Sequence, residues 1–195
     1  MADTIVFDIE TKKEFSEVGG RNFPQRLGVA VLAAYSYLKN DYVVFEEHEL
    51  KEFERMLEKT GLLIGFNIKS FDIPVLQPYV SLNLTQIPML DLMDAVISGA
   101  GFRVSLDNLS RTTLGTSKSA DGLTALEWFR EGRVQDVKDY CRKDVEITKR
   151  LYEFGKEHGH VKFVSRRGVD EVTISVAWAD HVPAGASKDR QARLI

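Results

Sequence analysis

The stretch Thr4-Ile5-Val6-Phe7-Asp8-Ile9-Glu10 near the amino terminus decides the fold. It is apolar on both faces until Asp8, which is typical of a strand buried inside a sheet. Side chains two residues apart on a strand share a face, so Asp8 and Glu10 lie side by side at its carboxyl end. Carboxylates that close repel unless they share a proton or a cation, and a hard divalent metal fits best. A strand that simply ends in two solvated acids is the alternative.

The segments that follow show alternating strand and helix patterns. Strands are expected over 27–37, 42–47, 62–64 and 87–91, and helices over 49–59 and from about Asp72–Pro74. The polar turn Lys39-Asn40-Asp41 joins the first two of these strands into a hairpin. The later succession of strand, helix and strand indicates a crossover connection. The pattern therefore predicts an α/β domain.

The second half of the chain is predominantly helical. Ser105 is expected to cap a helix that ends at Gly115, and Thr124 with Glu127 forms a capping-box pattern. A longer helix is expected over 134–157, ending at Gly159.

The remaining residues differ in character. Segments 161–166 and 171–178 predict a small hairpin, and 183–195 is rich in Ala, Gly, Ser and Arg, so we expect a flexible tail. We therefore divide the chain into a main domain, 1–159, and a C-terminal hairpin and tail, 160–195.

Composition narrows the function classes. The chain has 195 residues, a net charge of -3 and one cysteine, Cys141. A single cysteine excludes a disulfide framework and a cysteine-based zinc site, and favours a reducing, cytoplasmic location. No stretch approaches the roughly eighteen apolar residues of a membrane span, so no membrane partner is expected. The slight negative charge argues against a nucleic-acid coat protein, but allows an enzyme that contacts a strand locally.

A second acidic candidate lies on the long helix. At 100° per residue, Asp144 falls in the middle of an apolar stripe, with Tyr140 one turn earlier, whereas Asp139 points to solvent. An ionised Asp on a packed face costs several kcal/mol unless it is paired or metal-bound. It could instead bond a backbone N–H or a neighbouring cation, but Arg142 and Lys143 are too close in sequence to face it.

A third acid, Asp72, follows the strand-to-helix junction that begins Gly65-Phe66-Asn67. Taken alone, Asp72 is well explained as a helix N-cap. It becomes a functional candidate only in the company of the other acids.

The three patterns together resemble the exonuclease motifs of the DEDD superfamily, the ribonuclease H-like 3'-5' exonucleases. They occur in the family's order as Asp8-x-Glu10, Asn67-x-x-x-Phe71-Asp72 and Tyr140-x-x-x-Asp144. The tyrosine four residues before the last acid is similar to the DEDDy subclass. Segments 105–109 and 121–133 look most like the YprB-like branch. The resemblance covers about residues 3 to 158 and implies a ribonuclease H-like mixed sheet flanked by helices.

The resemblance also implies a two-metal site with Mg²⁺ or Mn²⁺. Asp8, Glu10 and Asp144 would hold one ion, and Asp8 would bridge to a second about 4 Å away. Asp72 would order the water shell of the second ion. Tyr140 would orient the attacking water rather than act as a base, because its ordinary pKa is near 10.

The implied substrate is the 3' end of single-stranded nucleic acid, DNA ahead of RNA. Thr11, Asn67 and Phe71 match positions that touch the terminal nucleotides in relatives. A helicase or another nuclease is the expected protein partner. Two alternatives stay open: a structure-specific or RNA-processing nuclease with the same acids, and a noncatalytic module that binds a nucleic-acid end or a partner protein.

Overall fold

The computed structural model describes residues 2–117, 122–165 and 170–180. In these residues the strands are β1 (Asp3–Thr11), β2 (Val29–Ser36), β3 (Asp41–Glu46), β4 (Thr60–Gly65), β5 (Met89–Asp91), β6 (His160–Val164) and β7 (Glu171–Ser175). The α-helices are α1 (Leu50–Leu57), α2 (Asp72–Leu76), α3 (Leu92–Ala100), α4 (Leu106–Leu114), α5 (Gly122–Arg130) and α6 (Val134–His158), and a short 3-10 helix, η6, covers Trp178–Asp180. None of the helices in these ranges has both the length and the apolar character needed to cross a bilayer.

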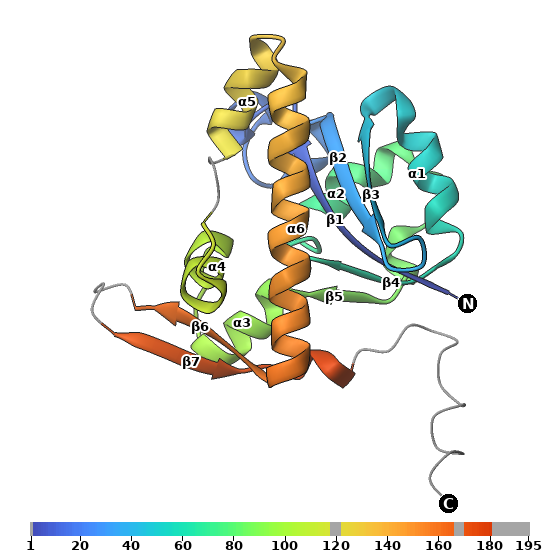
Figure 1. Ribbon diagram of the computed structural model, residues 1–195. Helices are drawn as coiled ribbons and strands as arrows, with labels where there is room; N and C mark the ends of the chain where they lie inside the picture. The colour runs from blue at the N-terminus through green and yellow to red at the C-terminus, as the bar shows by residue number, and fades with distance from the viewer. Residues whose placement is uncertain (1, 118–121, 166–169, 181–195) are drawn as a thin grey trace, which may run out of the picture.

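Strands β1 to β5 form one sheet in the order β3-β2-β1-β4-β5. β2 lies antiparallel to β1 and to β3, whereas β4 lies parallel to β1, and β5 parallel to β4. The antiparallel half contains the predicted hairpin, and helical crossovers produce the parallel half. The predicted α/β fold, a mixed sheet flanked by helices, is confirmed (Figure 1).

The two faces of the sheet bury separate cores. Val6 on β1 belongs to the core under α6, together with Val31 and Ala33 of β2. Ile5 and Phe7, the alternate residues of β1, belong to the core on the other face, which α1 and α2 cover. β1 therefore is apolar on both sides, as its sequence predicts. The even-numbered residues of β1 point to the face of the sheet that α6 crosses (Figure 1).

Most helix boundaries follow the expected capping signals. Ser105 caps α4 by accepting a 3.2 Å hydrogen bond from the backbone of Asn108. α6 ends in a left-handed C-cap at Gly159, with φ of 71°. The prediction that a capping box at Thr124 begins a helix is wrong, because α5 already begins at Gly122 and Thr124 lies inside the helix. A capping box is a short local pattern, and the same residues also occur in helix interiors.

The predicted C-terminal hairpin is present as β6 and β7, which pair antiparallel. Val161, Ile174 and Trp178 bury their side chains in the same core as α6. The indole ring of Trp178 lies against Gly155, where an added Cβ would clash with it. The hairpin thus completes the core under α6. The turn at 167–168 and the tail at 183–195 lie outside the described residues, and the division of the chain at residue 159 stays a prediction.

Candidate active site

The carboxyl end of β1 presents two acids toward α6. Asp8 lies opposite Ala33 of β2, and Glu10 opposite Val31. Both acids have the parity of Val6, so they point to the α6 side of the sheet. The register between β1 and β2 shifts between Glu10 and Thr11. Both acids therefore lie in the regular part of the β1–β2 ladder, directly before an irregularity of the kind that bends a strand.

α6 contributes the third acid from its buried face. Asp144 is only 3 % exposed, in the core stripe where the helical periodicity places it. The neighbouring cations contact other residues: the Arg142 guanidinium lies over the ring of Tyr42, and Lys143 Nζ is 3.1 Å from a carboxylate oxygen of Glu146. Both cations that adjoin Asp144 in sequence thus have contacts of their own with other residues.

Asp8, Glu10 and Asp144 converge. One carboxylate oxygen from each lies within 4.8 Å of the others. Across residues 2–117, 122–165 and 170–180, no other three His, Cys, Asp or Glu side chains approach one another so closely. An all-oxygen donor set of this kind is what hard divalent cations prefer. Three acids partly withdrawn from water and brought together would repel strongly without a cation or shared protons. The donor set therefore fits Mg²⁺ or Mn²⁺.

Asp72 lies beside this cluster and is held by the backbone of β1. It is the first residue of α2, and Phe71 occupies the N-cap position. Asp72 is 2 % exposed, and its Oδ1 accepts a 3.0 Å hydrogen bond from the backbone N–H of Ile9. Burial and the nearby Asp8 carboxylate raise the pKa of Asp72 well above its ordinary value. The interpretation of Asp72 as a plain N-cap is wrong, because its side chain reaches back to the strand that carries the other acids.

The turn before Asp72 is tightly constrained. A Cβ on Gly65 would collide with Ile68 and with the carbonyl oxygen of Phe7. Asn67 adopts a left-handed conformation with φ of 69°, which asparagine tolerates better than most residues. These two positions let the chain turn sharply at the end of β4, and the turn brings α2 back toward β1.

Asp91, at the end of β5, fixes the same turn. Its Oδ1 accepts hydrogen bonds from the backbone N–H groups of Asn67 (2.7 Å) and Met93 (3.0 Å), and its Oδ2 accepts one from Lys69 (3.0 Å). Burial raises the pKa of Asp91 despite these donors. Asp91 is not among the functional acids predicted from the sequence, although it lies at a strand end as Asp8 and Glu10 do. It acts as a brace for the segment that leads to Asp72.

Tyr140 lies one turn before Asp144 on α6 and is 2 % exposed. Its hydroxyl is hydrogen-bonded to the Asp144 carboxylate. Burial, with the charges of Asp144, Glu10 and Asp8, raises the pKa of Tyr140. The phenol therefore stays protonated and acts as a hydrogen-bond donor at the cluster. The ring of Trp128 meets that of Tyr140 edge to face at 6.3 Å and restricts its orientation.

Cys141 is also part of this environment. Its fully buried thiol lies 3.4 Å from the backbone oxygen of Asp8 and 3.8 Å from Asp8 Oδ2. Burial and the adjacent Asp8 raise the pKa of Cys141, so the thiol remains protonated. Cys141 thus fills core space as well as contacting Asp8.

A cavity of about 440 Å³ opens over the cluster. Its lining contains Asp8, Glu10, Thr11, Phe71, Tyr140 and Asp144. Asn67 and Asp72 are not in that lining. Thr11 donates its hydroxyl proton to the backbone oxygen of Lys13, and the side-chain oxygen of Asn67 accepts a 2.6 Å hydrogen bond from Arg103. The structure thus places two of the three expected substrate contacts, Thr11 and Phe71, at the cavity.

The cavity has an apolar wall that sequence patterns did not predict. Phe15 meets Phe71 edge to face at 5.9 Å. Leu126 and Leu123 come from α5, and Leu123 is 63 % exposed. Lys13 adds the basic side chain of the lining. The signal available in the sequence was the amphipathic pattern of α5, which does not reveal which apolar residues face a cavity.

Comparisons with known proteins place this chain in a family. The family model described as the RNase H superfamily matches residues 5–154, and the chain belongs to this superfamily. No curated protein sequence matches it. Among solved structures it is similar to the family B DNA polymerase from the hyperthermophilic archaeon Pyrobaculum calidifontis, with a TM-score of 0.61 and 18 % identity. That match covers 80 % of this chain and 24 % of the polymerase chain, and shows a shared fold.

Proposed function

We propose that this protein is a metal-dependent 3'-5' exonuclease of the DEDDy type, in the YprB-like branch, acting on single-stranded DNA or RNA. One observation carries the proposal: Asp8, Glu10 and Asp144 come from a strand and a distant helix, yet their oxygens lie within 4.8 Å of one another. Membership of the RNase H superfamily supports nuclease chemistry at such a cluster.

The cluster would bind two Mg²⁺ or Mn²⁺ ions through Asp8, Glu10 and Asp144, with Asp72 ordering the water shell of the second ion. Bound ions of this kind activate water and stabilise the attacking and leaving oxygens of a phosphodiester. The carboxylate of Asp72 is held by the backbone without a substrate. The backbone of Ile9 holds Asp72, and the brace at Asp91 holds the turn that precedes it.

Tyr140 would orient the attacking water. Its hydroxyl already lies at the Asp144 carboxylate, and its raised pKa keeps the proton in place. A protonated phenol can donate to the water oxygen or share its contact with Asp144, but it cannot remove a proton at neutral pH. Its contribution is therefore one of positioning.

The cavity suits the end of a flexible strand. Phe71, Phe15 and Leu123 offer an apolar surface beside the acids, against which a terminal base or sugar can pack. In-line attack by water on the last phosphodiester breaks the bond to the 3' oxygen. The departing nucleotide keeps its 5'-phosphate, and the shortened strand gains a 3'-hydroxyl.

The proposal also covers the division of the chain into domains, the protein partners and the location in the cell. Residues 1–159 would contain all the ligands, and 160–195 would add the hairpin and tail. A helicase or another nuclease would supply single-stranded ends, and the enzyme would work in the cytoplasm. These statements rest on the sequence resemblance and on the single cysteine.

The test uses oligonucleotides labelled at the 5' end, incubated with Mg²⁺ or Mn²⁺. A ladder that shortens one nucleotide at a time, with release of nucleoside 5'-monophosphates and inhibition by a 3'-phosphate, supports the proposal. Cleavage of a circular single strand would instead support a structure-specific or RNA-processing nuclease. No hydrolysis of DNA or RNA with either metal would support a noncatalytic binding module.

A further inference from the structure

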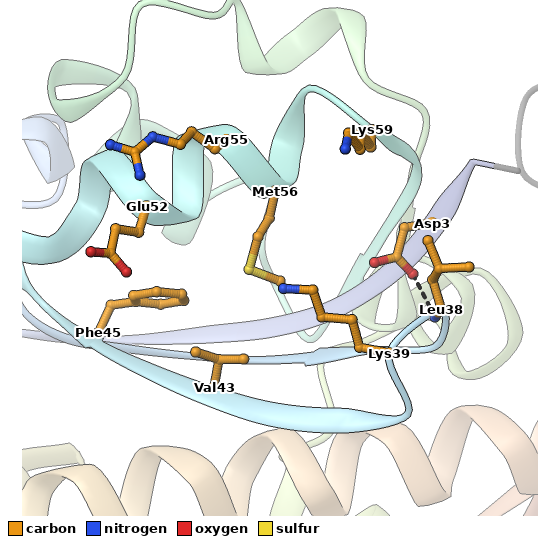
Figure 2. A pocket seen from close by; sticks show the side chains of 9 residues that line it. All are labelled: Asp3, Leu38, Lys39, Val43, Phe45, Glu52, Arg55, Met56 and Lys59. Carbon is orange, nitrogen blue, oxygen red and sulfur yellow. Dashed lines mark hydrogen bonds between the residues drawn. The ribbon is translucent and has the colours of Figure 1, made fainter.

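A second pocket lies between α1 and β3, with a volume of about 320 Å³. Figure 2 shows its apolar floor: Val43 and Phe45 point from β3 toward the helix, and Met56 points from α1 toward the strand. Phe45 is buried, whereas Val43 and Met56 keep part of their surface accessible. We call this site the α1–β3 pocket. β3 is an edge strand of the sheet, so the pocket lies at the border of the molecule.

The rim of the α1–β3 pocket is predominantly basic. Lys39, Arg55 and Lys59 are exposed side chains around the floor (Figure 2). None of the three forms an ion pair with another residue of the part of the chain that the structure describes. Unneutralised cations around an apolar surface attract an anionic ligand that also carries an apolar group.

The acids at this pocket offset the positive charge only in part. Asp3 is buried, and its carboxylate accepts hydrogen bonds from the hydroxyl of Ser36 and the backbone N–H of Leu38. Its oxygens are thus turned toward the protein. Glu52 is the exposed acid of the lining. Three cations against one exposed acid leave the rim positive.

The α1–β3 pocket is remote from the candidate active site. Val43 pairs with Ala34, which pairs with Phe7, so the pocket lies on the face of the sheet away from Asp8. Asp3 begins β1, whereas Glu10 lies near its end, and seven residues of extended strand span about 23 Å. A nucleic-acid strand with its end at the acids would have to pass around the sheet to reach this pocket. A protein ligand is therefore favoured over the substrate.

We propose that the α1–β3 pocket docks an acidic segment of a partner protein, with one large apolar side chain of that segment in the floor. Carboxylates of the segment would meet Lys39, Arg55 and Lys59, and the apolar side chain would cover Val43, Phe45 and Met56. A single anchor with exposed charges gives weak, salt-sensitive binding. This docking function is separate from the nuclease activity and does not depend on it.

Fluorescence anisotropy with a labelled peptide tests the proposal. The probe has phenylalanine at its centre and acidic residues on both sides, and a second probe has serine at the centre. We expect binding of the first probe to weaken at least 10-fold in the double variant Arg55→Glu with Lys59→Glu, and to weaken similarly for the serine probe with wild-type protein. Arg150→Glu, which changes an exposed cation on α6, is the matched control and should bind as wild type.

Three results would overturn the proposal: no binding of the phenylalanine probe at 1 mM, equal binding by the double variant, or equal binding of the serine probe. Binding of oligothymidylate that the double variant loses would assign the pocket to nucleic acid instead and would also contradict it. Melting temperatures show whether the double variant folds. If it does not, Lys39→Glu, in the turn between β2 and β3, repeats the test away from the helix.

Discussion

Acidic residues lie at the carboxyl ends of two strands, β1 and β5, on the same side of the sheet, but the surroundings of these residues differ. Asp91, at the end of β5, accepts three backbone hydrogen bonds from the adjoining turn and helix. Asp8 and Glu10, at the end of β1, converge with Asp144 instead. An acid whose oxygens accept backbone N–H groups stabilises the fold. Acids that converge on one another destabilise the metal-free protein and create a site for a cation. The same residue type thus serves structure in one strand and chemistry in the other.

The largest expected effect is on catalysis. Asp144→Asn should reduce hydrolysis of a single-stranded oligonucleotide to the level of an enzyme-free control, because it removes a charged ligand and preserves the shape of the side chain. The metal-free protein should melt at the same temperature or higher, since repulsion with Asp8 and Glu10 is relieved. Single-turnover assays and thermal unfolding measure the two effects.

Asp139→Asn is the matched control on the same helix. Asp139 is exposed, and its carboxylate accepts a hydrogen bond from Gln135. This variant should retain wild-type turnover. Full activity of Asp144→Asn, or an equal loss in both variants, would remove Asp144 from the proposed metal ligands.

At Asp91, by contrast, we expect a substitution to reduce the stability of the metal-free protein. Asp91→Ala should lower the free energy of unfolding by about 2–4 kcal/mol without metal, because it leaves several backbone N–H groups without their acceptor. Denaturant unfolding measures the loss. Stability equal to that of wild type would contradict the role of Asp91 as a brace and would weaken the contrast between the two strands.

A smaller effect on rate is expected at Tyr140. Tyr140→Phe should lower the single-turnover rate about 100-fold, the scale on which a lost positioning contact slows an enzyme. Metal affinity should remain close to that of wild type, because the carboxylates are unchanged. The ring would still meet Trp128. A wild-type rate at saturating metal would make Tyr140 a core residue only.

The smallest expected effect is a pH-dependent change in stability at Glu54, a hydrogen-bonded acid outside the acidic cluster. Lys51, through a hydrogen bond, and Ser81 lower the pKa of Glu54 to about 2. Because the pKa is depressed in the folded state, the stabilisation is present above about pH 4.5 and is lost as the pH falls toward 2. Glu54→Gln should therefore lower the melting temperature at pH 7, and the difference from wild type should shrink at pH 3.

Glu58→Gln, an exposed acid after the same helix, is the control for that experiment and should change little at either pH. A difference between wild type and Glu54→Gln that is equal at both pH values would show that its carboxylate charge is not what stabilises the fold.

The sequence predicts those features that depend on periodicity. Alternation along β1 places Asp8 and Glu10 on one face, and the 3.6-residue repeat places Asp144 in the buried stripe of α6. Both placements agree with the structure. Periodicity works here because each pattern is repeated over many residues, so that one misleading position does not change the result.

Features that depend on contacts between distant segments are not visible in the sequence. Asp72 has the local pattern of an N-cap, but its partner, Ile9, is 63 residues away. Asn67 fits a motif associated with substrate, yet its side chain bonds Arg103. Leu123 and Phe15 share a cavity wall only because the fold brings α5 and the start of the chain together. Local patterns identify the kind of residue and leave its partner undetermined.

Metal-dependent thermal unfolding tests most directly whether the convergent acids at the end of β1 bind a metal ion. Wild type, Asp8→Ala and Asp139→Asn are melted without metal and with Mn²⁺ at about 100 times the dissociation constant, where binding stabilises the folded state by about 2.7 kcal/mol. We predict a rise of several degrees for wild type and Asp139→Asn and none for Asp8→Ala. An equal rise in Asp8→Ala, or no rise in wild type, would contradict the assignment of the convergent acids as a metal site.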